Sequence, residues 1–241
     1  MIDNGGSSAN RPISYTTWFS AARFANWMHN GQGSGSTETG AYTLVSGQTS
    51  GTAPSRNAGA LFALPTESEW KKAAYYQPEA SGGPSGGYWW YPTRSMFLPG
   101  NVVGGAPNQA NYYTNNVLSV TQQTWPPSPT QNYLTDVGAF TGSASYYGTF
   151  DQGGNVSEWN DVDGTPSTQR GALGGHWGGY YAFMNRANSV TYYAGNTGGG
   201  FRLWSPTSTP VPEIDPAGLG SVLALVTGAL GLLERRRAGG A

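Results

Sequence analysis

The sequence predicts an α+β fold with two helices, a few short strands and long loops. Apolar residues follow helical spacing in two segments, whereas strand-like pieces elsewhere alternate with Gly, Asn and Pro. The chain has 37 glycines and 16 prolines among 241 residues, which is typical of loops. It also has 9 Trp, 15 Tyr and 8 Phe, and disordered chains lack such aromatic content. We therefore expect a loop-rich globular domain.

The first helix is predicted near residues 18–28. Ser14, Thr16 or Thr17 would cap its start, and Gly31 lies just beyond its end. Its core-facing residues recur three, four and seven positions apart: Trp18, Ala21, Ala22, Ala25 and Met28.

The second helix opens with the sequence Thr66-Glu67-Ser68-Glu69. This is a capping box, in which a hydroxyl group and a carboxylate each satisfy a backbone N–H group. Trp70 and two alanines then supply an apolar face. The predicted strands are short, at 42–45, 88–91 and 201–204.

The chain changes character near its C-terminus. A linker rich in Pro, Ser and Thr covers 205–216, and an uncharged apolar run follows at 217–233. As a helix this run would be about 26 Å long, enough for a thin bilayer. The arginines in the tail at 234–241 would hold its end on the cytoplasmic side. A buried core helix is the alternative, and we predict a transmembrane helix.

The composition excludes several classes of site. The chain has no cysteine, which removes disulfides, thiolate metal centres and cysteine nucleophiles. Two histidines are too few for a three-histidine metal centre. Only 10% of residues are charged and the net charge is -1, so the sequence offers no basic surface for nucleic acid.

Four motifs occur in a fixed order between about residues 11 and 204. They are Pro12–Trp18 with Ala25-Asn26-Trp27, Leu64–Trp70, Gly154–Trp159, and Arg170–Trp177 followed by Gly200-Phe201-Arg202. In this order they resemble the formylglycine-generating enzyme family, also called the sulfatase-modifying factor domain. The resemblance implies a variant of the C-type lectin-like fold over 11–204, with its helices packed on a small sheet.

The two ends of the chain carry further expectations. The motif Val211-Pro212-Glu213-Ile214, with the apolar run and the arginines, resembles the PEP-CTERM sorting signal of exported bacterial proteins, in a variant with Ile214 at the second proline. That resemblance implies export, temporary anchoring in the membrane and processing by an exosortase-type peptidase. At the front, Met1–Asn4 shows no signal peptide, and we expect residues 1–10 to be disordered or truncated.

The resemblance does not extend to the family's redox chemistry. The family's oxidase binds copper with two cysteines, and their positions fall at Gly179 and Met184 in this sequence. A lone thioether is a weak copper ligand, and an ordinary packing role for Met184 is the simpler interpretation. We therefore expect no copper and no formylglycine formation.

Calcium is the metal that the resemblance implies. The matching loop would bind a structural Ca²⁺ through the side chains of Asp151 and Glu158 and the carbonyls of Gly154 and Val156, a set of hard oxygen ligands. A plain turn with its acids facing water is the alternative.

A second calcium site in the family would involve Asn111 and Tyr112 with a partner near 130–132. The family's aspartate is not matched there.

Aromatic side chains suggest a binding surface. Tyr180 and Tyr181 adjoin the lost copper site, beside His176 and Trp177, and rings of this kind form stacking platforms for sugars or peptides. The alternative is that they only cover loops and core.

We predict a non-catalytic, exported cell-surface protein that is stabilised by calcium and binds an extracellular polysaccharide or a protein. The competing hypothesis is a metal-dependent enzyme with a relocated site around His176, Asp161 and Arg202. A structural role for Arg202, satisfied by carbonyls or a buried acid, is the simpler interpretation of that residue.

Overall fold

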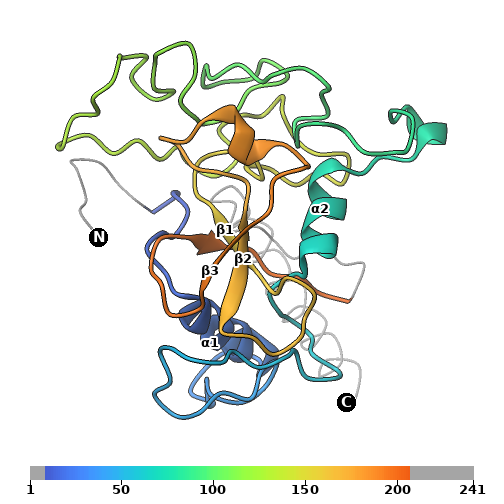
Figure 1. Ribbon diagram of the computed structural model, residues 1–241, viewed down its shortest axis with the longest axis vertical. Helices are drawn as coiled ribbons and strands as arrows, with labels where there is room; N and C mark the ends of the chain where they lie inside the picture. Colours follow the sequence, from blue (N-terminus) through green and yellow to red (C-terminus); the bar gives the residue numbers. More distant parts are fainter. Residues whose placement is uncertain (1–8, 207–241) are drawn as a thin grey trace, which may run out of the picture. The chain divides into compact units, whose positions relative to one another are not determined.

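The computed structural model describes residues 9–206 and has the predicted α+β character (Figure 1). The elements, in order, are α1 (Trp18–His29), α2 (Glu67–Tyr75), the 3₁₀ helix η1 (Glu79–Ser81), β1 (Glu158–Asn160), β2 (Gln169–Leu173), the 3₁₀ helix η2 (Tyr181–Met184), β3 (Val190–Tyr193) and β4 (Gly200–Phe201). Loops make up most of the remainder.

The predicted sorting motif, transmembrane helix at 217–233 and basic tail lie outside the described residues. Between residues 9 and 206, no helix is long and apolar enough to span a bilayer. At the front, the Asn10 carbonyl accepts a hydrogen bond from the Val137 N–H group at 2.8 Å, so residue 10 already contacts the fold.

Four strands form one mixed sheet in the order β3-β2-β1-β4. Strand β2 is antiparallel to both β1 and β3, and β1 is parallel to β4. In β1, Trp159 lies opposite Ala172 on one side and Phe201 on the other. Thr16 pairs with Gly199 in an isolated bridge, so the segment before α1 joins the segment before β4.

The predictions of strands at 42–45 and 88–91 are wrong, because their backbone groups find partners outside a sheet. The Tyr42 N–H group donates to the side chain of Asn26 at 2.7 Å, and Tyr88 makes only a single bridge to Tyr76. The predicted strand at 201–204 overlaps β4 at Phe201 alone.

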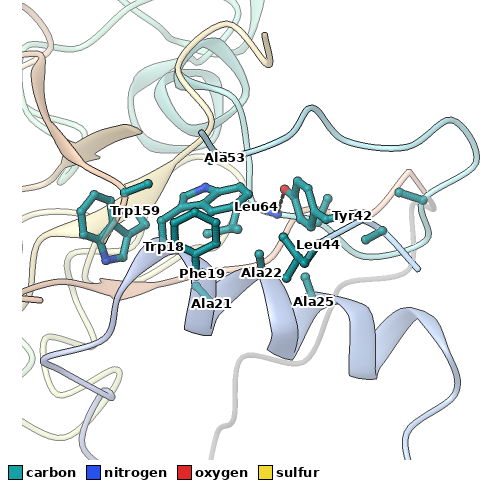
Figure 2. Close-up of a cluster of buried hydrophobic side chains, with 14 residues drawn as sticks. Trp18, Phe19, Ala21, Ala22, Ala25, Tyr42, Leu44, Ala53, Leu64 and Trp159 are labelled. Carbon is teal, nitrogen blue, oxygen red and sulfur yellow. Dashed lines mark hydrogen bonds between the residues drawn. The ribbon is translucent and has the colours of Figure 1, made fainter. Parts of the chain in front are cut away.

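Both predicted helices are confirmed. Thr17 caps α1 by accepting a hydrogen bond from the Ser20 N–H group, and the box at Thr66 and Glu69 caps α2. The buried face of α1 packs against Trp159 of β1 and the loop residue Leu64 (Figure 2). Burial of this face fixes α1 on the sheet.

A charged cluster is buried beside α1. The Asp161 carboxylate, 1% exposed, accepts hydrogen bonds from Trp18 Nε1 at 2.8 Å and from the Tyr42 hydroxyl at 2.6 Å. Arg170 Nε lies 3.6 Å from the same carboxylate, and its Nη2 donates to the carbonyls of Ala53 and Pro54. Burial raises the pKa of Asp161 to about 6, although Tyr42, Arg170 and Trp18 act in the opposite direction.

Candidate functional site

The motif Gly154–Trp159 joins the sheet to the long loops. The Gly154 N–H group donates to the Gly174 carbonyl at 2.7 Å, and the Asn155 N–H group donates to the Asn111 carbonyl at 2.8 Å. Gly154 has a φ of +78°, and a Cβ added to it would lie 2.0 Å from the Asn111 carbonyl oxygen. Only glycine fits this close approach of two backbones.

The Asn155 side chain connects three loops. Its Oδ1 accepts from Asn111 Nδ2 and from the Thr135 N–H group, both at 3.0 Å, and its Nδ2 donates to the Thr135 carbonyl at 3.2 Å. The Asn155 carbonyl also accepts from the Trp177 N–H group at 3.1 Å. Asn111 and Asn155 are both buried, so neutral amides hold this part of the fold together.

Glu158 is paired with Arg202. Its Oε1 accepts from Arg202 Nη2 at 2.6 Å, and its Oε2 accepts from Arg202 Nε at 2.5 Å and from Trp70 Nε1 at 2.7 Å. Arg202 Nη2 also donates to the Phe150 carbonyl at 3.0 Å. The contacts tie α2, β1 and the residue after β4 together. Arg202 therefore has the structural role that was the simpler interpretation of the sequence.

The calcium ligand set expected from the resemblance does not fit this arrangement at Glu158. Both oxygens of that carboxylate already accept hydrogen bonds, and the guanidinium of Arg202 balances its charge. Asp151 Oδ2 accepts from the Gly138 N–H group at 2.6 Å. Of the four expected calcium ligands, the two that are not side-chain carboxylates are the backbone carbonyls of Gly154 and Val156. Among residues 9–206, no three side chains of Asp, Glu, His or Cys gather to hold a metal.

The residues of the second expected calcium site also have protein partners. Asn111 Nδ2 donates to the Tyr133 carbonyl at 2.8 Å, and the Tyr112 carbonyl accepts from Ser119 Oγ at 3.2 Å. The Tyr112 hydroxyl donates to the Pro99 carbonyl. These contacts make the pair part of the buried loop packing.

The two positions of the family's cysteines have ordinary roles. Met184, 1% exposed, packs with Tyr91, Ala110 and Tyr112. Gly179 is a backbone junction, because its carbonyl accepts a hydrogen bond from the Tyr113 N–H group at 3.0 Å. This bond brings the loop at 176–181 beside the loop at 111–114.

Exposed aromatic rings gather at that junction. The ring of Tyr113 makes edge contacts with Trp125 and with Tyr180, each at 5.7 Å between centroids. Trp125 is 53% exposed and Tyr180 is 60% exposed. In Figure 1 the green loops and the orange η2 segment lie at the end of the sheet away from α1. We call Tyr113, Trp125 and Tyr180, together with the exposed next residue in the chain, Tyr181, the aromatic face.

The remaining predicted binding residues support this face. Trp177 stacks on the buried Tyr133 at 4.9 Å between centroids. His176 lies within the turn that carries Gly178 and Gly179, and its Nδ1 accepts from the Gly178 N–H group at 3.3 Å. Desolvation by the surrounding loops lowers the pKa of His176 below its usual value.

Sequence reasoning missed Tyr113 and Trp125. Their signal was present, because both belong to the segment 95–135, which contains no Asp, Glu, Lys, Arg or His. A long uncharged segment with exposed rings is unusual for a protein surface.

The structure does not bring the residues of the competing enzyme hypothesis into one site. Asp161 is held by Trp18, Tyr42 and Arg170, while Arg202 is held by Glu158. His176 belongs to the turn below the aromatic face.

A small mixed sheet, two capped helices and long loops joined by buried hydrogen bonds define an α+β domain of the formylglycine-generating enzyme type. The chain belongs to the family described as the sulfatase-modifying factor enzyme 1-like domain, whose model matches residues 3–205. The family resemblance drawn from the four motifs is thereby confirmed. No curated protein matches the sequence.

Three of the solved structures that are similar to the chain are 17–19% identical to it. The structure of CarF is 19% identical, with a TM-score of 0.52, and the match covers 85% of this chain and 71% of that one. Variable protein 1 of Treponema denticola is 19% identical, with coverages of 83% and 72% and a TM-score of 0.40. PvdO of Pseudomonas aeruginosa is 17% identical, with coverages of 80% and 61% and a TM-score of 0.44. At this identity, the similarity to CarF supports the fold alone.

Proposed function

We propose that the chain is a non-catalytic binding protein whose aromatic face holds a polymer or a protein partner at the bacterial cell surface. The observation that carries the proposal is the exposed set of rings beside Gly179, a position where the resemblance places a copper-binding cysteine. Without cysteine the chain cannot build that centre. Trp and Tyr side chains provide large, rigid contact areas with little loss of conformational entropy on binding.

The metal-dependent enzyme gains no support from the geometry. A catalytic unit needs a nucleophile or base within hydrogen-bonding reach of its partner groups. Asp161 and Arg202 instead complete two separate buried pairs, each with its own acceptors and donors.

Export is supported by the resemblance of the tail to a PEP-CTERM signal, which lies outside the described residues. The apolar run at 217–233 would anchor the chain until an exosortase-type peptidase removes it. The intact mass of the mature protein from its own cells tests this. A mass that lacks everything after about Pro212 supports export, whereas an unprocessed chain of 25.4 kDa contradicts it.

Binding is tested with the purified full chain and envelopes of the producing cells. We expect saturable binding without release of product, and at least about tenfold weaker binding by the double variant Tyr180→Ala, Tyr181→Ala. Tyr147→Ala is the matched control, because Tyr147 is an exposed ring on another loop, in contact with Tyr146. Equal binding by all three proteins would contradict the proposal.

A further inference from the structure

Within the aromatic face, the central ring of Tyr113 contacts two outer rings, those of Trp125 and Tyr180. Tyr113 meets Trp125 at an interplanar angle of 67° and Tyr180 at 69°. Both contacts are therefore edge-to-face, and neither outer ring is stacked flat on Tyr113. Both outer rings are more than half exposed, so a large part of each side chain is accessible to a ligand.

The two chain segments that supply these rings contain no Asp, Glu, Lys or Arg. Segment 95–135 supplies Tyr113 and Trp125, and it contains no ionisable residue other than tyrosine. Segment 171–185 supplies Tyr180 and contains His176 as its only Asp, Glu, Lys, Arg or His. An anionic polymer would therefore find no cation on these segments.

Polar groups on the same segments are amides and hydroxyls. Asn115 and Asn116 are exposed two and three residues after Tyr113, and Thr124 is exposed directly before Trp125. Amide side chains both donate and accept hydrogen bonds, as sugar hydroxyl groups do. The Tyr113 hydroxyl donates to Asn116 Oδ1, so the amide and the central ring are held together.

We infer that the aromatic face binds a neutral polysaccharide chain, with sugar rings stacked on Trp125 and Tyr180 and sugar hydroxyl groups bonded to neighbouring amides. This inference rests on the proposed function and names its ligand class. Nucleic acid also stacks on aromatic rings, but sites that bind it add a positively charged groove, which these two segments lack. Protein interfaces commonly use Arg anchors and complementary charges at the rim, which are also missing from these two segments.

The test is affinity electrophoresis of the full chain, in mild detergent, through gels containing defined polymers. The probes are the neutral and acidic fractions of extracellular polysaccharide from the producing cells, separated by anion exchange and treated with protease. Hydroxyethyl cellulose and alginate serve as neutral and acidic polymers of known structure. We expect retardation by the neutral cell fraction and no retardation by either acidic polymer.

Two single variants and one control sharpen the result. Trp125→Ala and Tyr180→Ala are each expected to weaken retardation at least about tenfold, whereas Tyr147→Ala leaves it unchanged. Thermal unfolding of each variant must match the parent, which separates a lost contact from a lost fold. Retardation should also persist at high salt, because no ion pair contributes to it.

The outcomes separate the inference from the proposed function. Retardation by the acidic fraction alone, or no retardation by the neutral cell fraction, overturns the neutral polysaccharide. If the chain still binds protease-untreated envelopes and loses that binding in the Tyr180→Ala, Tyr181→Ala variant, the proposed function stands with a protein partner. If envelope binding is also unaffected by that double variant, both fail.

Discussion

The two ends of the sheet use different chemistry to hold their buried polar groups. Beside α1, Asp161 and Arg170 form a buried ion pair with hydrogen bonds from Trp18 and Tyr42. At the loop end, the buried polar groups of Asn155, Asn111 and Thr135 are satisfied by hydrogen bonds between uncharged amides. The comparison shows that a buried ion pair holds one end of this fold, whereas uncharged amides hold the loops that carry the aromatic face.

The largest effect is expected from Arg202→Ala, which removes the partner of a carboxylate that is 5% exposed. Breaking a buried ion pair leaves an uncompensated charge, so we expect a loss of about 3–5 kcal/mol in the free energy of unfolding. Arg23→Ala is the control, because the Arg23–Glu38 pair is partly exposed and is worth about 1 kcal/mol or less. Equal losses in urea unfolding would contradict a structural role for Arg202.

The next effect is a dependence of stability on pH through Asp161. Its pKa is about 6 in the folded chain and 3.8 in the reference state, so the folded state binds the proton more tightly. The stability from this group is therefore complete below about pH 4 and is lost as pH rises through 6, by roughly 3 kcal/mol. The Asp161→Asn variant should lack this fall. Identical slopes between pH 4 and 7 would refute the assignment.

A smaller loss is expected for Asn155→Ala. The variant removes three hydrogen bonds, two of them to the buried backbone groups of Thr135, while Asn111 Nδ2 keeps its bond to the Tyr133 carbonyl, so we expect a loss of about 2 kcal/mol. Asn155 has a φ of +62°, and the exposed Asn115 has a φ of +50°. Asn115→Ala therefore controls for the left-handed backbone. Thermal unfolding that ranks the two variants equally would show that the amide network contributes little.

The smallest effect is expected from removal of calcium. A structural ion at a hundred times its Kd would add about 2.7 kcal/mol, which raises Tm by several degrees. Since Arg202 already neutralises Glu158, we expect EGTA to change Tm by about 1 °C or less. A fall of several degrees, reversed by added calcium, would restore the ligand set implied by the family resemblance.

The helices could be predicted because their signals are local. The capping box at Thr66 and Glu69 and the apolar face that begins at Trp18 lie within a few residues of each other. The strands could not, since β1 has three residues and all of them are buried. Three residues are too few for a period-two pattern to stand out from the loops around them.

The candidate site was predictable only in part for a related reason. Tyr180 and Tyr181 stand beside a motif position, whereas Tyr113 and Trp125 reach the same place through the fold. Glu158 and Arg202 were each noticed, but their sequence separation is 44 residues, and only the parallel pairing of β1 with β4 brings them together.

The bridge between Thr16 and Gly199 also bears on the order in which the protein can be made. A ribosome releases residue 16 long before residue 199, so the segment ahead of α1 must wait for almost the entire domain to be translated. Pairings between such distant residues form slowly, because a long loop has to close first. The nascent chain therefore stays incomplete until residues close to its last strand emerge, so the segment ahead of α1 remains unpaired through most of translation.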